Sequence, residues 1–206
     1  MAKSGLPVLL STGMSYLEEV QDAVRYLERH GANQIAILQC TSVYPLPSHL
    51  VNLRTIPTLV ATFPMYPVGF SDHSQGISCA IAAAALGTTI IEKHVTLDRT
   101  LPGPEHHFSI TMNDLATLVQ SVREVEAALG TAEKKPVAEE VELRHQYRRT
   151  LVAAVDIYKG EVLHAKHIAA KRTTQEGVGA EKYEDVLGCT ALQDISKDTP
   201  FTLDML

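Results

Sequence analysis

The sequence predicts an α/β fold in which four consecutive βα units form a half-barrel or a small open parallel sheet, followed by a compact β-rich module. Over the first 130 residues, short continuous apolar runs alternate with amphipathic helical patterns, which is typical of parallel strands covered by helices. Each run ends in polar residues, as the strands of barrels and open sheets do. We therefore expect the βα units at residues 1–130, a charge-rich linker at 131–149 and the β-rich module at 150–206.

Local patterns place the individual elements. Ser15 and Glu18 have the spacing of a capping box at the start of the first helix, and Gly31 is its expected stop. The next helix is expected to start near Asn52. The strands are expected at residues 8–10, 35–38, 67–70 and 88–91, and the last two helices at 77–86 and 112–129. The last helix should bury one face, formed by Leu115, Leu118, Val119, Val122 and Val125.

Composition excludes several classes of function. The net charge is −6 and neither part of the chain is basic, which argues against a nucleic-acid binder. No apolar run approaches the ~20 residues that span a bilayer, and no secretory signal follows the N-terminus. The three cysteines are too far apart for a disulfide framework or a zinc knuckle. We expect a soluble, cytoplasmic protein without a membrane partner.

His73 and His94 are the sharpest functional pair in the sequence. Each follows a charged residue at the expected carboxyl end of a strand, and the two strands are successive. Because neighbouring parallel strands lie ~4.8 Å apart, both imidazoles could reach one metal ion and leave positions for water and substrate. The alternative is that each histidine only hydrogen-bonds loop backbone.

Hydroxyl side chains follow the same strand ends. Ser11, Thr12, Ser42 and Ser71 are expected at one level of the sheet, where they could cradle a phosphate, although such residues more often cap the next helix. A stiff loop with two prolines after the fourth strand could hold Glu105 over the site, or could be an ordinary connection with His106 and His107 on the surface. Cys40 is expected to be a small buried residue.

Several motifs together resemble the N-acetylneuraminate (sialic acid) synthase family. They occur in the family's order and cover residues 10–15, 39–45, 51–54, 69–73, 91–99 and 101–104. Residues 151–161 resemble the antifreeze-like (SAF, β-clip) domain of the same enzymes. The resemblance implies the C-terminal half of a (β/α)₈ TIM barrel, strands 5–8, followed by a SAF domain.

The resemblance also implies a reaction. The family condenses phosphoenolpyruvate with an N-acetylated hexosamine, releases phosphate and forms a nine-carbon 2-keto acid. His73 and His94 match its metal ligands, usually for Mn²⁺ with Mg²⁺ as the alternative. Glu92 and Glu105 are the expected catalytic carboxylates, and Glu105 stands where the family commonly has Asp. The sugar could be N-acetylmannosamine or a precursor of legionaminic or pseudaminic acid.

Substrate-binding residues are implied in the same way. Ser11, Ser42 and Ser71 match positions that contact phosphoenolpyruvate, and Tyr44 lines the sugar side together with Glu92. Arg172 matches an arginine that reaches the sugar's N-acetyl group from the partner's SAF domain, so the resemblance implies a homodimer. The residues after Arg172 depart from the family pattern.

Four βα units leave two sheet edges unpaired, so we expect either a piece of a larger enzyme or two copies that close a barrel between them. On its own the chain is expected to be weakly active or inactive. The rival hypothesis is a non-catalytic protein that binds a partner subunit or a saccharide.

Overall fold

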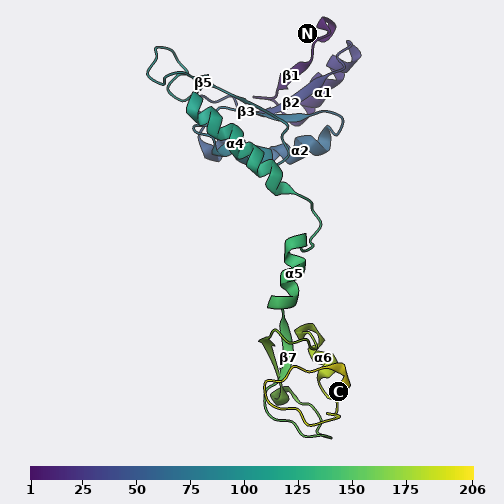
Figure 1. Ribbon diagram of the computed structural model, residues 1–206. Coiled ribbons are helices and arrows are strands. Elements are labelled where there is room, and N and C mark those ends of the chain that lie inside the picture. The colour runs from purple at the N-terminus through teal and green to yellow at the C-terminus, as the bar shows by residue number, and fades with distance from the viewer. The chain divides into compact units, whose positions relative to one another are not determined.

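The computed structural model describes residues 1–206 apart from the side chains of His145 and Gln146. The chain folds into two compact units, residues 1–131 and 132–206 (Figure 1).

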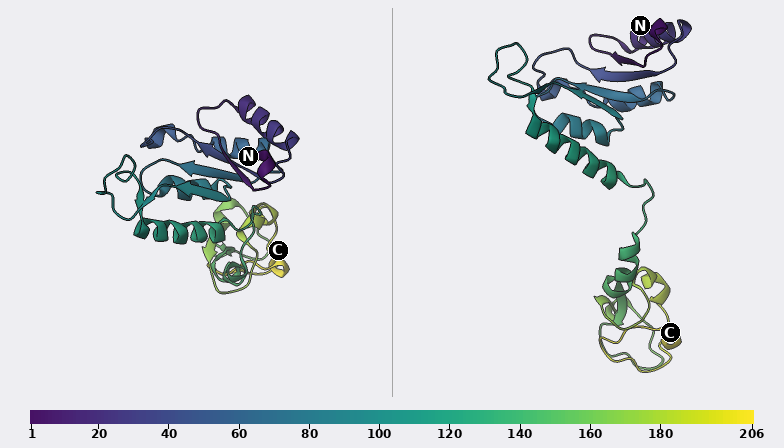
Figure 2. Two further views of the ribbon diagram at one scale, coloured as in Figure 1. Left: turned by 90° about the horizontal axis from the view of Figure 1, so that it is seen from above. Right: turned by 45° about the horizontal axis from the view of Figure 1, so that its top comes forward.

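The first unit contains a four-stranded parallel sheet in the order β1-β2-β3-β4, as expected for consecutive βα units. The strands are β1 Val8–Ser11, β2 Ile35–Cys40, β3 Val68–Asp72 and β4 Ile90–Lys93. The helices are α1 Leu17–Arg29, α2 Thr55–Thr62, α3 Ser78–Ala85 and α4 Met112–Leu129, with short 3₁₀ turns at Ala2–Ser4 and Ser48–Leu50. Figures 1 and 2 show α2 and α4 on the same side of this sheet.

Strand alternation gives the two faces of the sheet different roles. One face packs into the hydrophobic core against the helices, with Val8, Ile35, Ile37, Val68 and Phe70 all buried there. The opposite face carries Leu9, whose exposed fraction is 56%, and the polar residues near the strand ends. The apolar packing therefore sets the register and turns Ser71 and Glu92 away from the helices.

The start of α1 differs from the expected capping box. The Glu19 carboxylate, not that of Glu18, accepts a 2.7 Å hydrogen bond from the backbone N–H of Tyr16. The Ser15 hydroxyl instead donates to the carbonyl of Gly13 at 3.4 Å. The helix begins one residue later than expected, which shifts the capping interaction by one position.

Helix α4 has the expected bounds but buries a narrower face than expected. Leu118 is buried, and Leu115 and Val122 pack around it. Val119 is 51% exposed, so its assignment to the buried face is wrong. Val119 directly follows Leu118, and a step of about 100° around the helix axis turns it outward.

A second short parallel pair, β5 Val95–Thr96 and β6 Ile110–Thr111, precedes α4. It brings together the two ends of the proline-containing loop at residues 97–109. This loop carries Glu105.

The second unit contains α5 Ala138–Tyr147, β7 Arg149–Ala153, β8 Ile168–Arg172 and α6 Tyr183–Val186, with 3₁₀ turns at Ala165–His167, Ala180–Lys182 and Leu203–Met205. Strands β7 and β8 are antiparallel and pair Arg149 with Arg172. The structure differs from the expected linker, because residues 138–147 form a helix and belong to this unit. Among the described residues, no helix is long and apolar enough to cross a membrane.

Candidate active site

The carboxyl ends of β2, β3 and β4 bring Cys40, Ser71 and Glu92 to one level of the sheet. In the sheet register, Cys40 pairs with Ser71 and Ser71 pairs with Glu92. Ser11 pairs with Leu38, two residues before Cys40, and Ser42 follows Cys40 in the loop. The expectation of one common level for the serines is therefore wrong, because core packing sets a register that staggers them.

Ser71 and Glu92 are joined directly. The Ser71 hydroxyl donates a 2.6 Å hydrogen bond to Oε1 of Glu92. Residues opposite each other in a parallel ladder project to the same face, so this contact follows from their register. Ser71 is buried and Glu92 is exposed, so the bond holds a carboxylate at the open face of the sheet.

His73 and His94 lie beyond the ends of β3 and β4, with ring centroids 5.2 Å apart. Nδ1 of His73 is 3.0 Å from the Thr41 carbonyl oxygen, and Nδ1 of His94 is 3.1 Å from Oε2 of Glu105. A carbonyl oxygen can only accept a hydrogen bond, so Nδ1 of His73 is the donor to Thr41. Glu105 pairs with His94 through the same ring atom, Nδ1, so in both rings Nε2 is the nitrogen that remains for another ligand. For His73 the contact with loop backbone and the metal-ligand interpretation are compatible.

Two aromatic rings border the histidines. The ring centroid of Tyr44 is 4.1 Å from that of His73, and the ring centroid of the buried Phe108 is 5.3 Å from that of His94. Loss of hydration, then the nearby Cys40 thiol, then the Glu105 and Glu92 carboxylates raise the pKa of Tyr44, while a hydrogen bond with Ser42 opposes them. The phenol is thereby favoured in its neutral form beside the imidazoles.

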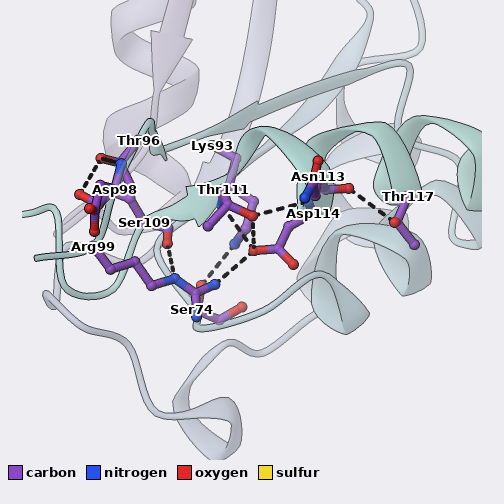
Figure 3. A network of polar contacts seen from close by, with 10 residues as sticks. All are labelled: Ser74, Lys93, Thr96, Asp98, Arg99, Ser109, Thr111, Asn113, Asp114 and Thr117. Carbon is purple, nitrogen blue, oxygen red and sulfur yellow. Dashed lines mark hydrogen bonds and ion pairs between the residues drawn. The ribbon is translucent and has the colours of Figure 1, made fainter.

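The loop that carries Glu105 is tied at its base (Figure 3). Nε of Arg99 donates to the Ser109 carbonyl at 2.9 Å, and Nη2 of Arg99 lies 2.8 Å from Oδ2 of Asp114. Ser109 in turn donates through its hydroxyl to the Glu105 carbonyl at 2.7 Å. The N-terminal turn of α4 thus helps to position the carboxylate that contacts His94.

The two other histidines of this loop have different surroundings. His106 is half-buried, with Nδ1 2.8 Å from the Thr96 hydroxyl, so the alternative of a solvated surface position does not hold for it. The Thr96 hydroxyl also donates to the Asp98 carbonyl at 2.9 Å (Figure 3), so His106 contacts a hydroxyl that is itself bonded to the loop backbone. His107 is exposed, as expected for a surface residue.

Cys40 and Gly13 both lie next to the predicted substrate-binding residue Ser42. Cys40 is buried, as expected, with Sγ 3.9 Å from the Ser42 hydroxyl and 4.0 Å from Nδ1 of His73. Any Cβ atom at Gly13 would overlap the Ser42 hydroxyl, which explains why glycine follows β1 here.

A buried ion pair that the sequence analysis did not predict joins the two residues that directly precede His73 and His94. Nζ of Lys93 lies 2.7 Å from Oδ2 of Asp72, and the two side chains are only 4% and 0% exposed. The available signal was a charged residue directly before each histidine, with opposite signs in the two motifs.

Arg172 lies in the second unit at the end of β8. Its side chain is exposed, and Cζ is 5.9 Å from the centroid of the Tyr147 ring. The remaining predicted site residues belong to the first unit.

Two histidines are the side chains of this cluster that could hold a metal ion. Among the described residues, no group of three or more His, Cys, Asp or Glu side chains could hold a metal ion. His73 and His94 offer two imidazole nitrogens on one side of the sheet edge, which leaves further coordination positions for substrate and water.

Fold and site together define an α/β protein whose parallel sheet presents paired histidines and carboxylates at its carboxyl edge, joined to a small β-rich domain. Residues 1–134 match the model of the NeuB family, and residues 148–206 match the SAF domain. The chain belongs to the NeuB family, which confirms the resemblance to N-acetylneuraminate synthases.

Curated relatives agree with this assignment. The chain is 44% identical to an uncharacterised protein of Methanocaldococcus jannaschii, over 84% of this chain and 51% of that protein. It is 38% identical to N,N'-diacetyllegionaminic acid synthase of Campylobacter jejuni (96% and 59% covered). It is 35% identical to human N-acetylneuraminate-9-phosphate synthase (96% and 55% covered). The chain therefore spans between half and three-fifths of the length of these relatives.

Solved structures show the same architecture. A spore coat polysaccharide biosynthesis protein of Bacillus subtilis is 34% identical, with a TM-score of 0.60, over 99% of this chain and 62% of that one. The N-acetylneuraminic acid synthetase of Leptospira borgpetersenii is 38% identical, with a TM-score of 0.64, over 71% of this chain and 52% of that one.

Proposed function

We propose that this chain takes part in the condensation of phosphoenolpyruvate with an N-acetylated hexosamine, giving a nine-carbon 2-keto acid and phosphate. The observation that carries the proposal is the cluster of His73, His94, Glu105 and the Ser71–Glu92 pair at one edge of the sheet. The names of the legionaminic and N-acetylneuraminate-9-phosphate synthases support the class of product. The four βα units would then be the C-terminal half of a (β/α)₈ barrel.

The two histidines are proposed to hold a divalent metal, Mn²⁺ or Mg²⁺, through their Nε2 atoms. Such an ion, when bound, supplies Lewis-acid polarisation of the sugar's aldehyde oxygen. The Thr41 carbonyl, which accepts from Nδ1–H of His73, and the Glu105 carboxylate, which pairs with Nδ1 of His94, are proposed to orient the two rings. Glu105 has a half-exposed side chain, so it can also face substrate.

Ser71 and Glu92 are proposed to act as a unit. With its hydrogen donated to Glu92, the Ser71 oxygen presents lone pairs, and Glu92 keeps its second oxygen free to accept from a sugar hydroxyl. Ser11 at the end of β1 and Ser42 in the loop after β2 remain proposed contacts to phosphoenolpyruvate.

The sugar side is proposed to include Tyr44, whose exposed neutral phenol can donate a hydrogen bond. Arg172 is proposed to bind the N-acetyl group in a homodimer. Its guanidinium is exposed and therefore available to a ligand. If so, Arg172→Ala should raise KM for the sugar in a functional assembly with little change in KM for phosphoenolpyruvate.

Phosphate release tests the proposal directly. The chain is mixed with Mn²⁺, phosphoenolpyruvate and N-acetylmannosamine or a precursor of legionaminic or pseudaminic acid, with a chelator control and the His94→Ala variant. Weak, chelator-sensitive release that His94→Ala abolishes is the expected result. Folded protein that binds Mn²⁺ and phosphoenolpyruvate without releasing phosphate would favour the non-catalytic alternative.

A further inference from the structure

Lys93 and Asp72 form a nearly solvent-free ion pair on the helix-facing side of the sheet. Their Cα positions are partners in the last paired position between β3 and β4. Lys93 donates through Nζ to Oδ2 of Asp72 at 2.7 Å and to the Ser74 carbonyl at 2.8 Å. Oδ1 of Asp72 accepts from the backbone N–H of Ser74 at 2.8 Å. Figure 3 shows Lys93 reaching Ser74.

These bonds fix the residues on both sides of His73 in the chain. The residue before it, Asp72, and the residue after it, Ser74, are both bonded to Lys93, which directly precedes His94. On the other side, the backbone N–H of Leu46 donates to the His73 carbonyl at 3.0 Å. The backbone of His73 is therefore held relative to that of His94 beyond the point where regular strand pairing stops.

Stability alone does not account for a buried ion pair at this position. A well-packed apolar pair of similar volume often gives a protein that is at least as stable. An apolar pair could not bond to the Ser74 carbonyl and N–H. The bonds of this pair to both backbone groups of Ser74 therefore indicate a role in orienting the residues around His73.

We propose that Lys93, acting through Asp72 and Ser74, is a positioning residue that sets the separation of His73 and His94 for joint binding of one divalent metal. The inference rests on the proposed function, because it assumes that both imidazoles bind the same ion. Lys93 itself faces the helices and takes no part in coordination.

Co²⁺ titration of the full chain tests this, because the visible spectrum of Co²⁺ reports the nitrogen ligands and their geometry. Replacing Lys93 alone would leave a buried charge on Asp72 and could prevent folding. The informative variant is therefore the double replacement Asp72→Asn with Lys93→Met, which removes both charges, and its fold is checked by circular dichroism. Lys93→Arg is the conservative variant.

The folded double variant should bind Co²⁺ about 10–100-fold more weakly than the unchanged chain and with an altered spectrum. Lys93→Arg, which keeps a positive charge beside Asp72, should retain the spectrum of the unchanged chain. The matched control is Lys171→Met, which breaks the exposed ion pair with Asp198 and should leave binding unchanged.

Different outcomes separate the two proposals. Unchanged affinity and spectrum in the folded double variant, with binding lost in His73→Ala and His94→Ala, would overturn the role of Lys93 and leave the metal site intact. No Co²⁺ binding by the unchanged chain would overturn both.

Discussion

Nδ1 of His94 lies 3.1 Å from Oε2 of Glu105, so a carboxylate carried by a proline-containing loop orients an imidazole carried by a strand end. The loop is closed by Arg99, which bonds to the Ser109 carbonyl and to Asp114. The position of Glu105 therefore depends on α4 as well as on the loop.

Glu105→Gln should weaken metal binding about tenfold, because a neutral amide oxygen is a poorer acceptor for the Nδ1–H of His94 and makes the ring less basic. Isothermal titration with Mn²⁺ measures the effect. The metal affinity of Glu105→Asp should lie between those of the unchanged chain and Glu105→Gln, because the aspartate side chain keeps the charge but is shorter. Glu124→Gln, an exposed change on α4, is the control, and equal affinities for all variants would contradict the orienting role.

His73→Ala and His94→Ala should each reduce Mn²⁺ affinity at least tenfold, because each removes one of two imidazole ligands. His107→Ala is a matched control, as it removes an exposed histidine from the same loop. Electron paramagnetic resonance of free Mn²⁺ gives the bound fraction. A loss confined to His107→Ala would place the metal elsewhere.

Tyr44 should have a pKa above the ordinary tyrosine value of 10.0, because partial loss of hydration and neighbouring negative charges disfavour the phenolate. The difference in ultraviolet absorbance between the unchanged chain and Tyr44→Phe during alkaline titration isolates its ionisation. Glu105→Gln removes one negative neighbour and should lower the pKa of Tyr44. A Tyr44 titration at or below the ordinary value would show that its ring is not beside these carboxylates.

Leu118→Ala should lower the free energy of unfolding by about 2–5 kcal/mol, because it opens a cavity under α4. Val119→Ala should change it by less than about 0.5 kcal/mol, since Val119 is mostly exposed. Urea denaturation followed by circular dichroism compares the two. Similar losses would mean that α4 packs through a different face.

Most secondary structure was predictable from local patterns. The apolar runs locate β1 to β4, and the bounds of α4 match the helical pattern at residues 112–129. Local patterns misplaced the α1 cap by one residue and did not predict α5, because residues 138–147 lack a regular apolar face. Such a charge-rich helix carries little of the signal on which the prediction depends.

Residue patterns alone were enough to predict the βα order, the family and the two histidines, because strand ends and sequence motifs are local properties. They could not determine the stagger of Ser11 and Ser71, or that Glu105 contacts His94. Sheet register follows from how the core packs, and the Glu105 contact follows from how a loop closes on α4. Both join residues distant in the chain, so their geometry exists only once the fold has formed.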